Sequence, residues 1–213
     1  SYLINGISLG SIYAIIALGY TMVYGIARML NFAHGDIIMV GGFVIFTCVS
    51  TMGFPPLVGV LVAVIACTVL GVMIERVAYK PLRGTSSLAV LITAIGVSYL
   101  LQNAALLIFG SNARQFTSVV NVPSLKLAGG ALSISGVTMV TILTCIIIMA
   151  GLMTFINKTK IGQAMLAVSE DTGAATLMGI DVNRTIAVTF AIGSALAAIA
   201  GALLCSTYPS LTP

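Results

Sequence analysis

Residues 57–74 read LVGVLVAVIACTVLGVMI, without a single charged side chain. A helix that crosses the hydrocarbon core of a bilayer needs about 20 such residues. Five further apolar runs have comparable lengths: 4–24, 37–52, 88–109, 132–156 and 185–208. Hydrophobic residues make up 59% of the 213 positions and charged residues 7%, whereas a soluble domain is ~45–50% apolar. The sequence therefore predicts an integral membrane protein with about six spans.

The spans are predicted to be helices. The alternation of apolar and polar residues over stretches of ~10 positions, typical of a membrane β-barrel, does not occur in the sequence. A helix satisfies its backbone groups within one segment, as the bilayer interior demands. We therefore expect an all-α fold, a polytopic transmembrane helix bundle in which residues 1–213 form a single domain.

The second run is the exception in length. It covers residues 37–52, contains Gly41-Gly42 and follows the turn His34-Gly35-Asp36. Such a segment can cross the membrane completely, or it can open a half-helix that begins within the membrane, as in many transporters. Both readings of residues 25–41 remain open from the sequence, and with them the side of the membrane on which the N-terminus lies.

Basic residues indicate which loops face the cytoplasm. One cluster falls between the third and fourth runs and another flanks the loop between the fifth and sixth: Arg76, Lys80, Arg83; Lys158, Lys160, Arg184. By the positive-inside rule both loops are cytoplasmic. The basic residues are spread over short loops and form no single patch, so the charge of +4 does not indicate nucleic-acid binding.

Small residues spaced by four mark the predicted packing faces. In lipid, helices associate through close contact, so such stripes lie where backbones approach. The first run carries Gly6, Gly10 and Ala14 on one face. The last run carries Gly193, Ala197, Gly201 and Cys205. We expect both stripes to pack against neighbouring helices of the bundle, with a dimer interface as the alternative.

Polar side chains in or near the spans are candidates for a substrate pathway. They are Tyr20, Tyr24, Asn31, His34, Asp36, Gln102 and Asn103. Each also has a structural alternative. The tyrosines can anchor a span at the membrane interface, Asn31 and Asp36 can cap the helix that follows, and the two amides can hydrogen-bond between helices. A helix start within the membrane would instead present N–H groups to the carboxylate of an anionic or zwitterionic solute.

Catalytic and metal sites are not predicted. His34 is the only histidine, which excludes a site built from several imidazoles within this chain. The sequence contains no G-x-S-x-G nucleophile motif, and we expect neither catalytic residues nor a cofactor.

The loop at residues 157–184 has the pattern of a helix. Its mostly apolar stripe is Ile161, Met165, Val168, Thr172, Ala175 and Met178, with Gly179 predicted to end it. Residues 169–172 are expected to break it into two short helices. A helix lying on the membrane surface carries Lys and Arg on its polar face, whereas the centre here is acidic, with Glu170 and Asp171. That pattern favours docking into a groove of another protein.

The energy source is predicted to lie outside this chain, because no G-x-x-x-x-G-K-[ST] phosphate loop occurs in it. An ion-coupled secondary transporter is the alternative. Such a protein needs ionisable residues within its spans, and the apolar runs contain none, with Arg28, His34 and Asp36 in a connecting turn.

Three motifs together resemble one family. GYTMVYGI at 19–26, NFAHGD at 31–36 and GQAMLAVSEDTGAATLMGID at 162–181 are similar to the permease subunits of branched-chain amino-acid ABC transporters, the Liv type. The similarity covers residues 1–213. Urea and short-amide permeases of the same superfamily carry close variants of the NFAHG stretch and are the alternative. From this resemblance we expect the remaining C-terminal spans of the family to be absent from residues 1–213.

The resemblance implies a subunit of the bacterial-type inner membrane. It implies that the 157–184 loop couples to the ATPase through Gly162, Ala167, Glu170, Asp171, Ala175 and Gly179. It also implies the partners: a second permease, two ATP-binding subunits and an extracytoplasmic solute-binding protein.

Overall fold

The computed structural model describes residues 2–116, 118–120, 123–127, 132–208 and 210–211. Within these residues, six helices are long and apolar enough to cross a membrane, as expected. The long helices are α1 (Tyr2–Ala27), α2 (His34–Phe46), α3 (Pro56–Ile74), α4 (Ser87–Phe109), α5 (Gly136–Lys158) and α8 (Val182–Thr207). The predicted all-α bundle is therefore confirmed.

Short elements complete the fold. The π-helical turn η1 (Thr47–Thr51) extends α2, while η2 (Glu75–Tyr79) and the 3-10 turn η3 (Lys80–Leu82) extend α3. Strand β1 (Arg114–Gln115) pairs with β4 (Ser210–Leu211), and β2 (Leu125–Leu127) pairs with β3 (Leu132–Ile134), both antiparallel. The fifth span therefore begins at Gly136 and not at 132, because the first residues of that apolar run pair in a hairpin.

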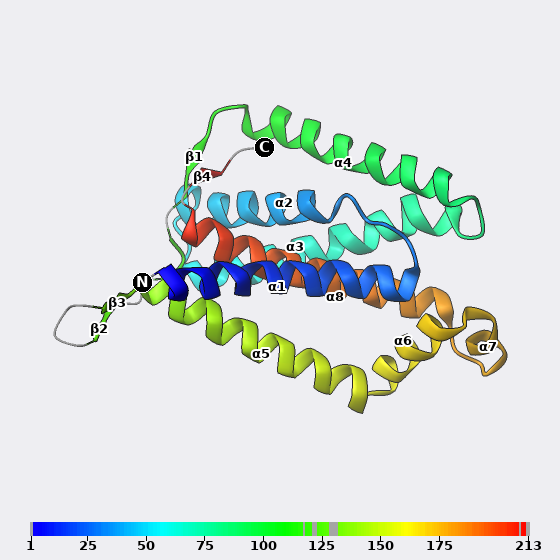
Figure 1. The fold of residues 1–213 in the computed structure, drawn as a ribbon. Helices are drawn as coiled ribbons and strands as arrows, with labels where there is room; N and C mark the ends of the chain where they lie inside the picture. The colour runs from blue at the N-terminus through cyan, green and yellow to red at the C-terminus, as the bar shows by residue number, and fades with distance from the viewer. Residues whose placement is uncertain (1, 117, 121–122, 128–131, 209, 212–213) are drawn as a thin grey trace.

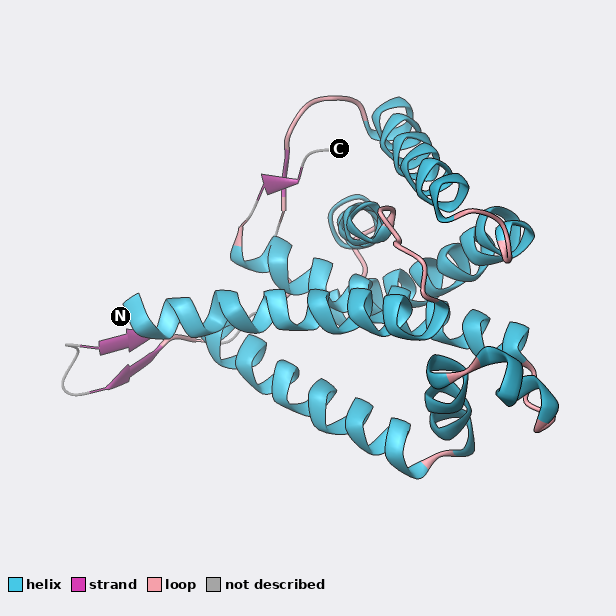
Figure 2. Ribbon diagram, turned by 45° about the vertical axis from the view of Figure 1, so that its right-hand side comes forward, coloured by secondary structure: helices cyan, strands magenta, loops and turns pink. Residues whose placement is uncertain are grey.

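Helix α8 lies at the centre of the bundle, in contact with α1, α2 and α3 (Figures 1 and 2). Its stripe of Gly193, Ala197, Gly201 and Cys205 is buried, which confirms that prediction. A Cβ added at Gly201 would lie 2.8 Å from the backbone oxygen of Ile38 in α2. The small residues therefore let the helix backbones approach one another.

The stripe on α1 packs within the described bundle only at Ala14, which is partly buried against residues of α1, α5 and α8, so the prediction was wrong for Gly6 and Gly10. Gly6 and Gly10 are exposed, and a Cβ added at either would contact nothing within 4 Å. The face that α1 buries carries Ile12 and Ile15, both 0% exposed. A spacing of four defines a face of a helix, but it does not show which face the neighbouring helices cover.

The two basic loops lie at the same end of the bundle. Figure 1 shows the α3–α4 connection and the short helices α6 (Lys160–Glu170) and α7 (Thr172–Leu177) at one end, and the start of α1 with the β2–β3 hairpin at the other. By the positive-inside rule the first end is the inner end. The start of α1 then lies at the outer end, which answers the question of sidedness that the sequence left open.

Candidate functional site

Helix α2 begins inside the bundle and not at its surface. The His34 ring lies against α1, with its Cε1 atom 3.0 Å from the position of a Cβ added at Gly19. It also contacts Tyr20 edge-on, with ring centroids 6.0 Å apart. Gly19 lies eight residues before the end of α1 at Ala27, a rise of about 12 Å. Of the two readings of residues 25–41, the structure therefore supports the half-helix (Figure 1).

Polar groups surround this helix start and are buried with it. Asn31, His34 and Asp36 are 3%, 4% and 8% exposed. The Asn31 side chain accepts a hydrogen bond of 3.1 Å from the Tyr79 hydroxyl, and Asp36 accepts one of 2.9 Å from Gln102 in α4. These bonds connect α2 to the end of α3 and to α4, so the buried groups join three segments that are distant in the sequence.

Two atoms of this cluster remain without a partner among the described residues. They are Nε2 of His34 and Oδ2 of Asp36, both buried. A buried polar atom without a hydrogen bond is rare, because desolvating it costs about 1–3 kcal/mol. The His34 nitrogen and the Asp36 oxygen are thus each available to hydrogen-bond a water molecule or a solute at the α2 N-terminus.

The capping role considered for Asn31 and Asp36 is wrong. Residue Ala33 is the N-cap of α2 and no side chain caps the helix. Asp36 lies within the first turn, where its carboxylate faces Gln102 instead of the helix's own N–H groups. The helix start therefore keeps its N–H groups uncapped by any described side chain.

Not all candidate pathway residues join this cluster. Tyr20, Asn31, His34, Asp36 and Gln102 lie together around the α2 start. Tyr24 is 50% exposed at the inner end. Asn103 is exposed on α4 and donates to the Tyr99 carbonyl one turn earlier. Sequence reasoning missed Tyr79, which lies in the charged segment after the third apolar run and had no motif to mark it.

Ionisable side chains lie within the helical spans, contrary to expectation. The second span begins at His34 and the third extends to Leu82, so they include Asp36 and Glu75, which is 1% exposed. The apolar runs were shorter than the helices because the π turn η2 continues α3 through charged residues. Glu75 is paired with Arg83, which also contacts Asn183 in α8.

The loop between α5 and α8 folds into two short helices, α6 and α7, which we call, with the cap that follows, the elbow (residues 160–179). The predicted break is confirmed at Asp171, whose carboxylate caps α7 by accepting the N–H groups of Gly173 (2.7 Å) and Ala174 (3.0 Å). These bonds lower the pKa of Asp171. Gly179 ends α7 with a φ of 82°, and the Ile180 N–H donates to the Ala175 carbonyl, a Schellman cap.

One side of the elbow is buried against the bundle. Met165 and Val168 are 0% exposed and Ala175 is 3% exposed. Gly162 is buried, and a Cβ there would overlap the backbone of Ile156. Half of the predicted apolar stripe, namely Met165, Val168 and Ala175, therefore packs on this chain, while Ile161, Thr172 and Met178 are exposed. Periodicity shows that a helix has an apolar face, but it does not show what covers that face.

The other side of the elbow projects away from the bundle. Glu170 and Asp171 are exposed there, with Leu177 90% and Met178 82% exposed. Ala167 is half-buried between the two sides. Arg28, at the end of α1, holds the corner by donating from Nη2 to the carbonyls of Ser169 (2.7 Å) and Glu170 (3.1 Å). A cation at the last turn of α6 is also favoured by the helix dipole.

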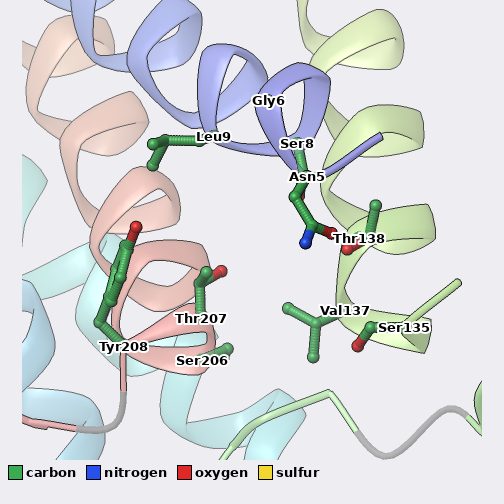
Figure 3. Close-up of a pocket in the computed structure, with 10 residues that line it drawn as sticks. All are labelled: Asn5, Gly6, Ser8, Leu9, Ser135, Val137, Thr138, Ser206, Thr207 and Tyr208. Atoms are coloured by element: carbon green, nitrogen blue, oxygen red, sulfur yellow. The ribbon is translucent and has the colours of Figure 1, made fainter. Parts of the chain in front are cut away.

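A pocket of about 450 Å³ opens at the outer end of the bundle. Figure 3 shows α1, α5 and α8 on its three sides. Its lining is Asn5, Gly6, Ser8, Leu9, Ser135, Val137, Thr138, Ser206, Thr207 and Tyr208. None of these described side chains is charged, and five of them are serine or threonine. No sequence motif indicated this pocket, because its residues come from three separate segments.

Comparisons with known proteins agree with one another. Residues 2–213 match the family model described as "Branched-chain amino acid transport system / permease component". The chain is 39% identical to the high-affinity branched-chain amino acid transport system permease protein BraD of Pseudomonas aeruginosa, over 99% of this chain and 72% of that protein. It is 40% identical to the corresponding protein LivH of Salmonella typhimurium, over 98% of this chain and 71% of that protein.

A more distant relative is the probable branched-chain amino acid transport permease protein LivH of Methanocaldococcus jannaschii, 29% identical over 91% of this chain and 62% of that protein. No solved structure matches the chain. The match to the family model spans nearly every residue, and the six described spans are those of a multi-pass membrane protein. The chain belongs to the family of branched-chain amino acid transport system permeases.

Proposed function

We propose that this chain moves branched-chain amino acids across the inner membrane and is driven by ATP-binding subunits that dock on the elbow. A permease of this family works with ATPase and binding-protein partners. The proposed assembly contains a second permease, two ATP-binding subunits and an extracytoplasmic solute-binding protein. Leucine, isoleucine and valine are proposed as substrates because the relatives are named for branched-chain amino acids.

The observation that carries this proposal is the two-sided structure of the elbow. The side that faces the bundle is held by the buried side chains of Met165 and Val168 and by the Arg28 hydrogen bonds. The side that faces away from the bundle presents the nearly fully exposed side chains of Leu177 and Met178, on the same side as the acidic Glu170 and Asp171. A force applied to the exposed side is therefore transmitted to the ends of α1 and α8, because the fastened side cannot move independently.

Exposed apolar side chains rimmed by charge are typical of a protein interface. Proposed coupling residues fall into two groups: Glu170, Asp171 and Gly179 are exposed and face the partner, whereas Gly162 and Ala175 are buried and hold the elbow. In this proposal Ala167 lies at the boundary. Residues 157–184 thus form the coupling loop of a single permease domain.

The proposed pathway passes the start of α2. A helix that begins inside the bundle presents N–H groups and a partial positive charge to a solute. The atoms without partners on His34 and Asp36 lie at this point. As ATP binding moves the elbow, the shift of α1 against α2 exposes this point to one side of the membrane and then to the other.

The test uses the assembled transporter with Leu177→Glu and Met178→Glu combined. Both side chains are exposed, so the fold is retained, while a carboxylate buried in an interface weakens docking. We expect the ATP-binding subunits no longer to co-purify and leucine uptake to fall at least tenfold. Gln163→Glu, exposed elsewhere on α6, is the matched control. Normal co-purification and uptake in the double variant would overturn the docking proposal.

A second measurement addresses the energy source and the substrate. Leucine uptake should stop when ATP is depleted and persist when the ion gradients are collapsed. Isoleucine and valine should compete with leucine, and urea should not. Uptake that depends on an ion gradient alone would instead assign the chain to the secondary transporters, in which His34, Asp36 or Glu75 would be the coupling groups.

A further inference from the structure

The outer pocket lies between two helix ends that carry opposite partial charges. Helix α5 starts at the pocket and α8 ends there, so the positive end of one helix dipole faces the negative end of the other. Figure 3 shows the α5 residues Ser135, Val137 and Thr138 on one side and the α8 residues Thr207 and Tyr208 across from them.

The start of α5 is not capped. Ser135 is in the N-cap position, but its side chain makes no cap hydrogen bond. The N–H groups of Gly136, Val137 and Thr138 have no acceptor within the helix, and none of them donates to another described residue. These N–H groups can therefore bind a carboxylate, which the dipole also favours.

The end of α8 offers acceptors. The Tyr208 N–H donates a hydrogen bond to the Leu204 carbonyl. The carbonyls of Cys205, Ser206 and Thr207 accept no hydrogen bond from a described residue. The Thr207 hydroxyl donates to the Leu203 carbonyl at 2.9 Å, so its lone pairs are left as acceptors. An ammonium group, which donates three hydrogen bonds and accepts none, fits this side.

Two buried side chains with unpaired hydroxyl groups provide an independent observation that points to a ligand. The side chains of Ser8 and Thr138 line the pocket and are 5% and 7% exposed. Neither hydroxyl makes a hydrogen bond with a described residue, although the other buried side-chain hydroxyl of the pocket, that of Ser206, donates to the Ala202 carbonyl. These side chains are buried, but their hydroxyl oxygens, unlike the fully buried Oγ1 of Thr141 on the same helix, remain accessible from the pocket, so the two are positioned for a partner that enters it.

We propose that this pocket binds the zwitterionic end of a neutral α-amino acid, with the carboxylate at the start of α5 and the ammonium at the end of α8. This inference rests on the proposed function and adds a site on the outer side. The described lining has no charged side chain, so an amino acid with zero net charge matches it better than a cationic or anionic one. Leu9 and Val137 provide the apolar contacts for the substrate side chain.

The pocket volume agrees with such a ligand. About 450 Å³ falls within the range of ~300–1,000 Å³ that is typical of small-molecule sites. The site lies at the end of the bundle opposite the elbow (Figure 1), where an extracytoplasmic binding protein would release its amino acid. The pocket is therefore the first site on the permease that the substrate meets.

The charge assignment is tested with Val137→Glu in the assembled transporter, with Val137→Gln as the matched control. Both side chains have the same length, but only glutamate brings a carboxylate that competes for the N–H groups of α5. We expect Val137→Glu to weaken binding of L-leucine to the permease complex, measured without the binding protein, about tenfold more than Val137→Gln does. Equal affinities in the two variants would overturn the assignment.

The hydroxyl assignment is tested with Thr138→Val and Ser8→Ala. Each removes one hydroxyl from the pocket, and we expect the KM for leucine uptake to rise several-fold. Thr154→Val is the matched control, since the Thr154 hydroxyl is exposed on the same helix and bonds only its own backbone. Unchanged KM in both pocket variants would refute this site but not the proposed function, which fails only if the native transporter takes up no branched-chain amino acid.

Discussion

The pair Glu75–Arg83 makes a quantitative prediction about the inner end of the bundle. Glu75 is 1% exposed and the Arg83 side chain 17% exposed. Arg83 also contacts Asn183 at the start of α8. Arg83→Met leaves a buried carboxylate without its cation, and such a loss costs about 3–5 kcal/mol. Because Arg83 is partly exposed, we expect the lower end of this range, about 3 kcal/mol.

The reverse substitution has a smaller effect. In Glu75→Met, Arg83 keeps its contact with Asn183 and its partial access to water, so we expect a loss of about 1 kcal/mol. In the double variant no charge is buried without a partner, and the loss should again be about 1 kcal/mol. Additive effects would instead total about 4 kcal/mol.

The assay is the midpoint temperature of unfolding of the purified protein in one detergent. For a chain of this size, 1 kcal/mol corresponds to roughly 2–4 °C, so Arg83→Met should lower the midpoint by roughly 6–12 °C. The double variant should recover most of that loss. A double variant that unfolds as early as the sum of the two single effects would show that the two side chains do not depend on each other, and the reasoning would fail.

Two further predictions concern packing and capping. A Cβ added at Gly71 overlaps Ser194 of α8, so Gly71→Ala should lower the same unfolding midpoint by an amount equivalent to about 1–3 kcal/mol. Adding Ser194→Gly should restore part of this loss. An unchanged midpoint in Gly71→Ala would mean that α3 and α8 are not in close contact. The pKa of Asp171 lies below the ordinary 3.8 because its carboxylate accepts the N–H groups of Ala174 and Gly173, so its capping stabilises α7 above that pH and is lost as the pH falls below it. Amide hydrogen exchange in α7 should therefore accelerate on acidification by more than the intrinsic effect of pH on exchange. The Asp171→Asn variant still caps the helix but does not titrate, so it should lack this additional pH dependence. The same pH dependence in both proteins would contradict the assignment.

Local features of the fold were predictable from the sequence. The positions of the six spans follow from apolar composition over the length of a bilayer, since a membrane helix needs little information from distant residues. The break of the elbow near Asp171 and its end at Gly179 were predicted correctly for a similar reason. Capping and a left-handed glycine act over three or four neighbouring residues, so the signal is contained in the local sequence.

Contacts between distant segments were not predictable in this way. The sequence singled out Asp36 and Gln102 but not their pairing, and it missed Tyr79 as the partner of Asn31. It also treated the Gly6 stripe and the stripe of α8 as equivalent, although only the second is buried. Each error has the same origin: a pattern along one helix defines a face, while the neighbour of that face depends on all the other helices.

Sequence alone thus determined that this protein is a helical membrane permease with a separate elbow, because hydrophobic length, caps and family motifs are properties of contiguous residues. The tertiary structure decided that α2 starts inside the bundle beside Gly19, that the elbow buries Met165 and Val168 on its own bundle, and that the start of α5 and the end of α8 lie on opposite sides of the outer pocket. Those features arise only when helices pack, since burial and the opposition of helix termini are relations between segments that no single stretch of sequence contains.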